Sequence, residues 1–316
     1  MKRVLVIVFS LVATSAFAQA FPSRPIRLLV GYAAGGGADA LARVLTPKLA
    51  EALGQGITVD NRPGAGGTLA GGVLAKAPPD GYTLYFSDAS LVTAPAIYRE
   101  LPFDPIGGLA PVAGVAALPL AFVVHPSVAV TTPQELIGLL RANPGKYSYG
   151  TPGIGTLHHL SSELLQKHAA LSFIHIPYKG AAPALTDLIG GQIPVAVTSA
   201  TAALAQAKGG KLRIVGLTSR ARLASNPEIA TIAEAVPGFE VTNDLFVIAP
   251  AGTPAAVIAT LEGALKSVLA QKELQAAYLA QGAIVAWSSA EALKARMAKD
   301  VTTWKTVARE AGIRPE

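Results

Sequence analysis

The stretch from Gly31 to Asp39 constrains the fold of this chain more than any other part of the sequence. It reads Gly-Tyr-Ala-Ala-Gly-Gly-Gly-Ala-Asp and follows a β-branched and leucine-rich run, residues 26–30. A helical spacing of leucines comes after it, at Leu41, Leu45, Leu49 and Leu53. A strand, a glycine-rich turn and a helix can together hold an anion, because glycines let backbone N–H groups approach it and the helix N-terminus adds about half a positive charge.

This motif alone does not decide between an anion site and a tight turn that binds nothing, because a glycine-rich turn without a full nucleotide-binding fingerprint is unspecific. Asp39 lies where its side chain can cap the following helix. Pro47 lies inside the helical pattern and removes a backbone donor, so we expect it to kink or shorten that helix.

Residues 1–20 are typical of a signal peptide. Lys2 and Arg3 precede an apolar run, residues 4–13, and Ala18-Gln19-Ala20 satisfies the small-x-small rule, so we expect cleavage near Ala20. The apolar run is too short to span a membrane comfortably. The chain has no cysteine, which excludes disulfides and a lipid anchor on cysteine. We therefore expect an exported, soluble, periplasmic protein.

The composition favours a compact α/β protein that does not bind nucleic acid. The 316 residues suffice for two lobes, 51% of them are hydrophobic and 15% are charged. The formal net charge of +6 includes Lys2 and Arg3 of the signal peptide. The remaining basic residues are spread along the chain and are not clustered with aromatic residues, as a nucleic-acid surface requires.

Hydrophobic patterns and turn residues predict an alternation of strands and helices. We expect further strands at 56–60, 82–86, 112–115, 120–125, 147–150, 173–177, 195–198, 212–217, 239–249 and 283–287. We expect further helices at 68–77, 91–99, 134–142, 157–168, 182–189, 202–208, 254–269, 273–279 and 290–310. Such an alternation is typical of parallel sheets, with ligands at the carboxyl ends of the strands.

The second half of the chain repeats the layout of the first. Thr132 and Glu135 form a capping-box pattern with Pro133 at the first helical position. A further glycine loop, Thr151 to Thr156, again lies between a strand and a helix. We predict lobe 1 from residues 21–108 plus 248–316, lobe 2 from 121–238, and crossing segments at 109–120 and 239–247. The late helices lack partners of their own and should pack back on lobe 1, leaving a cleft closed by a hinge.

An ordered set of motifs resembles the Bug receptors, the extracytoplasmic solute-binding proteins of tripartite tricarboxylate transporters. The set covers nearly the whole chain after the signal peptide. It comprises residues 21–26, 34–39, 61–67, 79–84, 101–105, 175–180, 182–187, 245–254 and 310–313. The resemblance implies an α/β, two-lobed, type II periplasmic binding protein of the Venus-flytrap kind, which captures a small organic carboxylate.

The resemblance also implies which residues bind the ligand. In the family, two loops grip the carboxylates through backbone amides and water, and here these are residues 34–39 and 151–156. The positions of Ser87-Asp88 and Thr198-Ser199 line the family's cleft. The candidate ligand-binding residues are Tyr32, Ala34, Gly35, Gly36, Gly37, Asp39, Ser87, Asp88, Thr151, Gly153, Gly155, Thr156, Tyr178, Thr198, Ser199 and Asp244.

Departures from the family pattern bear on the ligand. Asp88 stands where Asn is common, and Asp244 where Trp is common. Ile154 replaces an Asn, Leu157 a Ser or Thr, and Thr198 an Asp. Added carboxylates near the cleft disfavour a second ligand carboxylate, so we expect a monocarboxylate or amino acid rather than citrate.

Other chemistries find little support in the sequence. His158 and His159 are adjacent, so on a helix they point about 100° apart and do not form a chelating pair. We expect His159 to make a polar contact behind the loop. The chain contains neither a Gly-x-Ser-x-Gly nor a phosphate-binding P-loop, so we expect no metal, no cofactor and no enzyme activity. Tyr178 remains either a cleft residue or part of a turn at a strand end.

Two function classes follow. The first is a monomeric binding protein that delivers a small organic anion to integral-membrane transporter subunits. The second is a receptor that presents its closed form to a sensor kinase. An exported enzyme on the same fold is a more distant alternative.

Overall fold

The computed structural model describes residues 21–310 and 312–313. The predicted signal peptide lies outside the described residues, so its cleavage near Ala20 stays a prediction. None of the helices in the described part of the chain is both long and apolar enough to cross a membrane.

The strands and helices follow one another much as the hydrophobic patterns predict. The strands are β1 (Ile26–Val30), β2 (Ile57–Asn61), β3 (Thr83–Asp88), β4 (Leu109–Val124), β5 (Ser148–Thr151), β6 (Ile174–Pro177), β7 (Val195–Ser199), β8 (Arg213–Leu217), β9 (Thr242–Pro250) and β10 (Ile284–Ser288). The helices are α1 (Gly37–Leu53), α2 (Thr68–Ala75), α3 (Ser90–Thr93), α4 (Pro133–Ala142), α5 (Leu157–Ala169), α6 (Ala181–Ile189), α7 (Ala200–Ala207), α8 (Ala255–Leu269), α9 (Lys272–Ala280) and α10 (Ala290–Glu310). Short 3₁₀ turns are η1 (Ala65–Gly67), η2 (Ala94–Ala96) and η3 (Ile232–Glu234).

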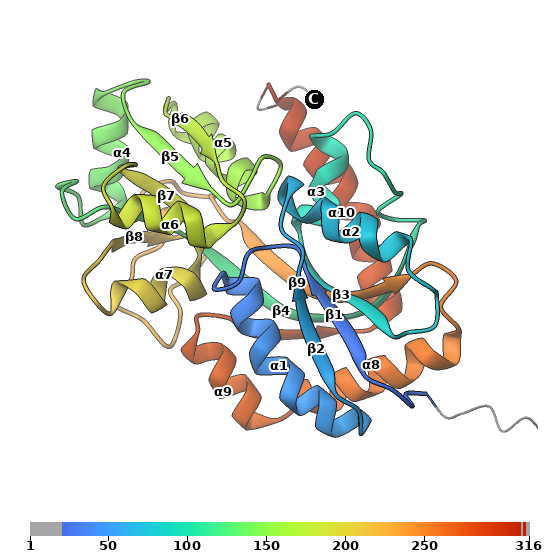
Figure 1. The fold of residues 1–316 in the computed structure, drawn as a ribbon. Coiled ribbons are helices and arrows are strands. Elements are labelled where there is room, and N and C mark those ends of the chain that lie inside the picture. The colour runs from blue at the N-terminus through green and yellow to red at the C-terminus, as the bar shows by residue number, and fades with distance from the viewer. Residues whose placement is uncertain (1–20, 311, 314–316) are drawn as a thin grey trace, which may run out of the picture.

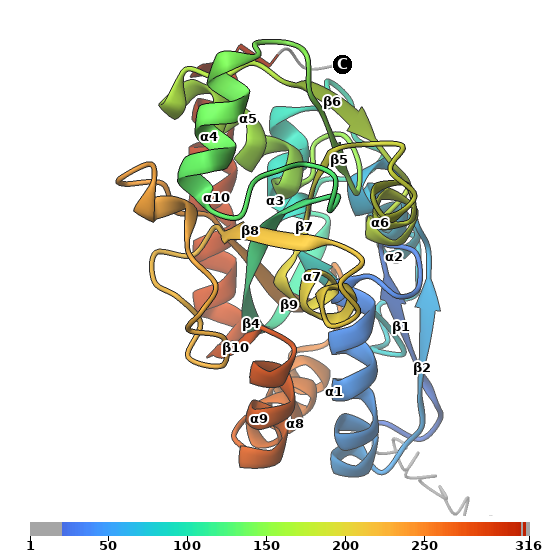
Figure 2. The ribbon, with the colours of Figure 1, turned by 90° about the vertical axis from the view of Figure 1, so that its left-hand side faces the viewer.

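The strands form one curled sheet in the order β2-β1-β3-β9-β4-β7-β5-β6, with β10 and β8 also paired to β4. Strand β4 joins two parts of this sheet (Figures 1 and 2). Its residues 109–119 pair with β9, and residues 120–124 pair with β7. We call β1, β2, β3, β9, β10 and residues 109–119, with their helices, the first half. We call β5 to β8 and residues 120–124, with α4 to α7, the second half.

The core of the first half lies on both faces of its sheet. Leu41 and Leu45 of α1 and Leu261 of α8 are fully buried in one cluster. Leu74 of α2 and Leu293 of α10 belong to a second cluster. Helix α8 packs on α1, and α10 packs on α3 and β4 (Figure 1). The late helices therefore return to the first half, as the sequence predicts.

Two local predictions are wrong, and one part of a third does not hold. Helix α1 is not shortened at Pro47 and continues to Leu53, because burial of leucines on both sides, about 2 kcal/mol each, outweighs the roughly 3 kcal/mol cost of an internal proline. The stretch expected as one helix over 91–99 divides into α3 and η2, and Pro95 lies in the first turn of η2. The two strands expected at 112–115 and 120–125 are one strand, β4.

The strand–loop–helix repeat is present in both halves. β1 leads through residues 31–36 into α1, and β5 leads through residues 152–156 into α5. The capping box of α4 is confirmed, since Thr132 accepts from the N–H of Glu135 and the Glu135 side chain reaches back. The lobe boundaries predicted from the sequence stay a prediction.

Candidate functional site

A pocket lies where the two halves meet, at the carboxyl ends of the strands. Its lining residues are Tyr32, Gly36, Gly37, Ala38, Asp88 and Asn243 from the first half, and Pro152, His158, Ala181 and Ser199 from the second. The cavity has a volume of about 20 Å³, which holds about one or two waters. The two glycine loops thus contribute to one shared cavity, as predicted from the sequence.

The N-terminus of α1 faces this pocket without a side-chain cap. Gly36 is the N-cap residue, with extended backbone angles, and no side chain accepts from the first helical amides. Amides of the first helical turn have no acceptor within the helix, and Gly37 and Ala38 line the pocket. A Cβ on Gly37 would lie 2.7 Å from Cβ of Ser199. Glycine at this position therefore lets the two halves approach each other.

Helix ends of the second half point at the same pocket. Ala181 is the first residue of α6, whose N-cap Gly180 offers no side-chain acceptor. His158 is the second residue of α5, and Ser199 is the N-cap of α7. All three residues line the pocket. Each helix N-terminus carries about half a positive charge, so the site attracts an anion through main-chain dipoles, and no lysine or arginine is among its described lining residues.

Asp88 adds a buried negative charge to one wall of the pocket. Oδ1 accepts from the N–H of Ser90 at 3.0 Å, and Oδ2 accepts from Nδ2 of Asn243 at 2.9 Å. The hydroxyl of Tyr32 donates to both oxygens, at 3.1 and 2.9 Å. Burial raises the pKa of Asp88, and the hydrogen bonds from Asn243 and Tyr32 oppose that rise. Its acceptor positions are largely occupied, so Asp88 acts on a ligand mainly through its charge.

The second glycine loop rests on a stack of two imidazoles. His159 and His175 stack with ring centroids 4.0 Å apart. Nδ1 of His159 accepts from the N–H of Gly155 at 3.3 Å, and Nε2 of His175 lies 2.6 Å from Oγ1 of Thr151. The two rings therefore hold opposite ends of the loop, and the prediction that His159 contacts the loop from behind is confirmed.

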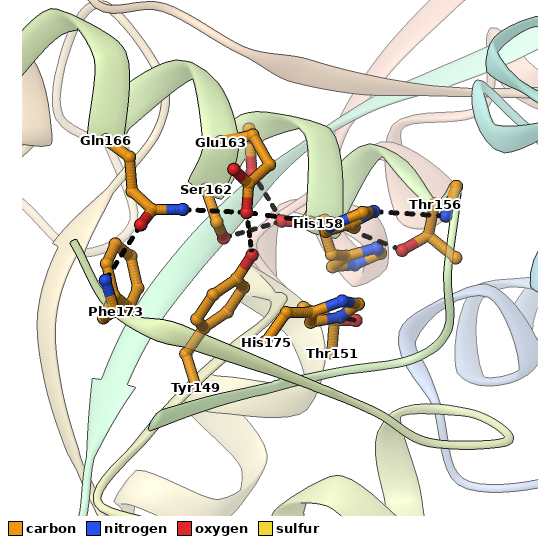
Figure 3. Close-up of polar contacts among 12 residues, drawn as sticks. Tyr149, Thr151, Thr156, His158, Ser162, Glu163, Gln166, Phe173 and His175 are labelled. Atoms are coloured by element: carbon orange, nitrogen blue, oxygen red, sulfur yellow. Dashed lines mark hydrogen bonds and ion pairs between the residues drawn. The ribbon is translucent and has the colours of Figure 1, made fainter. Parts of the chain in front are cut away.

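A further polar layer supports this stack. Tyr149 packs its ring against His175, with centroids 5.0 Å apart, and donates to Oε1 of Glu163 at 2.6 Å. Gln166 donates to the same oxygen at 2.8 Å (Figure 3). Burial lowers the pKa of His159 to about 4 and that of His175 to about 3. Both rings are therefore neutral near pH 7, and they can stack without repulsion.

Direct hydrogen bonds join the halves beside the pocket. Oγ1 of Thr93 donates to the carbonyl of Gly155 at 2.6 Å. The N–H of Leu157 donates to Oγ of Ser90 at 3.3 Å, and the hydroxyl of Tyr98 donates to the carbonyl of Ile154 at 3.2 Å. The structure is therefore a closed form, in which the second glycine loop is bonded to the segment after β3.

The structure brings some of the predicted site residues to the pocket and leaves others behind it. Those that line it are Tyr32, Gly36, Gly37, Asp88 and Ser199. The loop residues Ala34, Gly35, Asp39, Thr151, Gly153, Gly155 and Thr156 lie outside the lining, as do Ser87, Tyr178, Thr198 and Asp244. Several of these hold the loops: Thr156 caps α5 by accepting from the N–H of His159 at 3.4 Å.

Two predicted roles need correction. Asp39 does not cap α1; as the third helical residue it accepts from the N–H of Gly35 at 2.9 Å. Asp244 is outside the pocket lining and pairs with Arg296 at 3.3 Å. Tyr178, which the sequence left open between a cleft residue and a turn, is also outside the lining and donates to Oδ2 of Asp187 in α6 at 2.7 Å.

Some of the lining residues were not predicted from the sequence. Asn243 was overlooked beside Asp244, although alternation along a strand places neighbours on opposite faces. Ala181 follows Gly180, whose positive φ of +127° marks a tight entry into α6. His158 was not predicted as a lining residue either, whereas Ala38 and Pro152 belong to the two predicted loops. In the described part of the chain, no group of three or more metal-ligating side chains occurs.

The chain is similar in sequence and structure to known binding proteins. The family described as "Tripartite tricarboxylate transporter family receptor" matches residues 41–313. The protein BugT of Bordetella pertussis is 32% identical over 322 residues, covering 99% of each chain. The periplasmic binding protein BugD superposes with a TM-score of 0.89 at 32% identity, over 94% of this chain and 100% of BugD.

A solved relative is described with a small organic carboxylate, which in that protein is a dicarboxylate. The structure of R. palustris Rpa4515 with adipate superposes with a TM-score of 0.90 at 31% identity, over 94% of this chain and 100% of that one. These overlaps confirm the predicted fold, that of a two-lobed periplasmic binding protein.

Proposed function

Since the chain belongs to the family of tripartite tricarboxylate transporter receptors, we propose that it captures a small organic carboxylate between its two halves and delivers it to the membrane subunits of such a transporter. Residues 1–20 would direct export to the periplasm and be removed near Ala20. The mature chain would act as a monomer that binds its ligand without turning it over.

One observation carries this proposal: the N-termini of α1, α5, α6 and α7 meet at one pocket. Together they supply about two positive charges from the main chain, and they come from both halves. A carboxylate that accepts from amides of both halves stabilises the closed form. When the halves separate, these bonds are lost together, so the ligand can be released to a transporter.

Binding requires that the halves open. The closed pocket has room for about one or two waters, which is less than a carboxylic acid of several carbons needs. Opening breaks the bonds from Thr93 to Gly155, from Leu157 to Ser90 and from Tyr98 to Ile154. Two of these hydrogen bonds are buried and the third is partly buried. Each contributes about 1 kcal/mol net, so the free energy of ligand binding can offset the cost of opening the halves. We propose the predicted crossing segments, 109–120 and 239–247, as the hinge.

Asp88 favours a monocarboxylate or an amino acid over citrate. Two carboxylates about 5 Å apart repel each other by roughly 3 kcal/mol at an effective dielectric constant of about 20, which lowers affinity by roughly two orders of magnitude. No basic side chain among the described lining residues offsets this charge. A ligand whose second group is neutral or positively charged avoids the repulsion.

The proposal is tested with the protein purified without denaturation. Mass spectrometry of the released ligand should find a small carboxylate. Calorimetry should then give tighter binding for amino acids or monocarboxylates than for citrate. Tighter binding of citrate would overturn the ligand class. Turnover of a bound carboxylate would overturn the assignment as a binding protein.

Uptake assays separate delivery to a transporter from signalling. A strain that lacks this protein should lose uptake of the identified ligand, and expression of the full chain should restore it. Unchanged uptake with altered transcription would instead support a receptor for a sensor kinase.

A further inference from the structure

His158 stands apart from the other histidines near the second glycine loop. The rings of His159 and His175 hold Gly155 and Thr151. His158 is among the residues that line the pocket, and it is 4% exposed. Neither Nδ1 nor Nε2 of His158 has a hydrogen-bond partner among residues 21–310 and 312–313. A buried polar ring without a partner is destabilising unless something else bonds to it.

Hydrogen bonds hold the backbone of His158, whereas its ring makes none in the described part of the chain. Its carbonyl accepts from Oγ of Ser161 at 3.0 Å and from Oγ of Ser162 at 2.8 Å; Figure 3 shows Ser162 beside it. These bonds hold the start of α5, where the helix dipole is positive. His158 thus joins the pocket lining from a backbone held in place, which is the arrangement that a specific ligand contact requires.

The protonation state of His158 limits what it can bind. Burial lowers the pKa of the ring to about 3, so at neutral pH it has one donor and one acceptor nitrogen. Asp88 and Asn243 line the same pocket, but they are already bonded to each other at 2.9 Å. Ser199 also lines the pocket, but its oxygen already accepts from the N–H of Ala202 as the cap of α7. His158 is the lining residue whose two ring nitrogens both lack a partner in the described part of the chain, so it can recognise a polar group on the ligand.

We propose that His158 is a specificity-determining residue that hydrogen-bonds an amino or hydroxyl group beside the ligand's carboxylate, so that the pocket selects small 2-amino or 2-hydroxy monocarboxylates. This inference rests on the proposed function, because the helix N-termini must hold the carboxylate. The closed pocket is small, with a cavity volume of about 20 Å³, and therefore suits a ligand with a short carbon chain. The charge of Asp88 tolerates an ammonium or hydroxyl group there and opposes a second carboxylate.

Calorimetry with matched probes at pH 7.5 tests the proposal on the mature full chain. L-Alanine, L-lactate and propionate differ in the group next to the carboxylate, and succinate carries a second carboxylate. We expect L-alanine or L-lactate to bind about tenfold more tightly than propionate, as one additional hydrogen bond allows. In His158→Leu this preference should fall to within about twofold, and propionate affinity should change little. His158→Gln, which keeps a neutral donor and acceptor, should retain part of the preference.

A second measurement distinguishes ligand recognition from a structural role. Without ligand, His158→Leu should melt at or above the wild-type temperature, because it removes an unpartnered buried ring. A clearly lower melting temperature, or an unchanged preference in His158→Leu, would overturn the proposal. The proposal would also be overturned if succinate, with proton uptake as the pH is lowered from 8 to 5, bound more tightly than L-alanine and L-lactate. If no carboxylate binds at all, the proposed function itself fails. If carboxylates bind but their order of affinity is the same whichever residue stands at 158, the inference alone fails.

Discussion

Gly35 donates its backbone N–H to Oδ2 of Asp39 at 2.9 Å, and Asp39 is the third residue of α1. The second glycine loop repeats this relationship, since Gly155 donates to Nδ1 of His159, the third residue of α5. In each half, a side chain of the first helical turn binds one loop amide and fixes the loop. Asp39 is also bonded to Arg43 and Asn61, at 3.0 and 2.9 Å, so this anchor is part of a larger network.

Asp39→Ala should weaken ligand binding although Asp39 does not line the pocket. The change frees the Gly35 amide and leaves Asn61 without its carboxylate partner, so we expect about 1–3 kcal/mol lower stability and roughly tenfold weaker binding. Calorimetry and thermal melts measure both. The control is Asp80→Ala, which removes the exposed ion pair with Arg24 and should leave affinity unchanged. Equal losses in both variants would contradict the role of Asp39.

Gly36→Val should abolish most of the binding while the fold survives. Gly36 has φ −79° and ψ 168°, which any residue adopts, and a Cβ there would lie 3.8 Å from Cβ of Ala181 across the pocket. The valine methyl groups would therefore occupy the space in front of the amides of α1. Circular dichroism should be unchanged, whereas affinity should fall by roughly a hundredfold or more. Gly56→Val, at a position with nothing near its Cβ, is the matched control; wild-type affinity in Gly36→Val would refute the loop assignment.

Gly37→Ala should hold the two halves apart. The added Cβ would collide with Ser199, whose Cβ is 2.7 Å away, whereas within α1 alanine is a better helix former than glycine by about 1 kcal/mol. We expect a larger radius of gyration in solution scattering and weaker binding. Adding Ser199→Gly to Gly37→Ala should restore closure in part. If the single variant closes on ligand like the wild type, the contact between α1 and α7 does not limit closure.

Asn243 and Asp244 should respond differently to mutation. Asn243 donates to Asp88 in the pocket wall, and Asp244 pairs with Arg296 on the other side of β9. Asn243→Ala leaves the buried Asp88 with one donor fewer, so binding should weaken by roughly tenfold or more. Asp244→Asn should change affinity by less than about twofold. If calorimetry shows that Asp244→Asn weakens binding more than Asn243→Ala does, then Asp244 and not Asn243 acts on the ligand.

Acid should destabilise the second half through its histidine stack. The folded-state pKa of His159 is about 4 and that of His175 about 3, below the ordinary value near 6.5. The unfolded chain therefore binds protons first, and stability is lost as the pH falls from about 6.5 towards 3. The loss is on the order of 3 kcal/mol for His159.

Denaturant titrations at pH 7, 5 and 4 check this pH dependence. His175→Gln cannot be protonated, so its stability should fall less steeply between pH 6.5 and 4 than that of the wild type. The control His168→Gln changes an exposed histidine at the end of α5 and should keep the wild-type slope. Parallel stability curves for all three proteins would rule out the stack as the cause.

The order of strands and helices could be predicted from the sequence because it depends on local patterns and turn residues. The sequence did not show that α1 would continue through Pro47, because tertiary burial of Leu45 and Leu49 compensates the free-energy cost of the internal proline. The glycine loops were recognised as parts of one site, since strand–loop–helix motifs of an α/β fold place their loops at the same edge of the sheet.

The individual lining residues were harder to predict. Asn243 and Asp244 differ only in which face of β9 they occupy, and that register is fixed by pairing with β3 and β4, far away in the sequence. Asp39 was assigned to a cap because the sequence does not fix where a helix begins, and the N-cap is Gly36, three residues earlier. His158 was not predicted as a lining residue, because the sequence does not show which of two adjacent histidine rings will be hydrogen-bonded and which will lack a partner.

The crystal structure of the protein with the carboxylate that it retains on purification tests the central claim most directly. We predict that the carboxylate oxygens accept from amides at the N-terminus of α1, at Gly37 or Ala38, and from amides at the N-terminus of α6 or α7, directly or through one water. A carboxylate held by a lysine or arginine side chain, or bound to one half alone, would contradict the account.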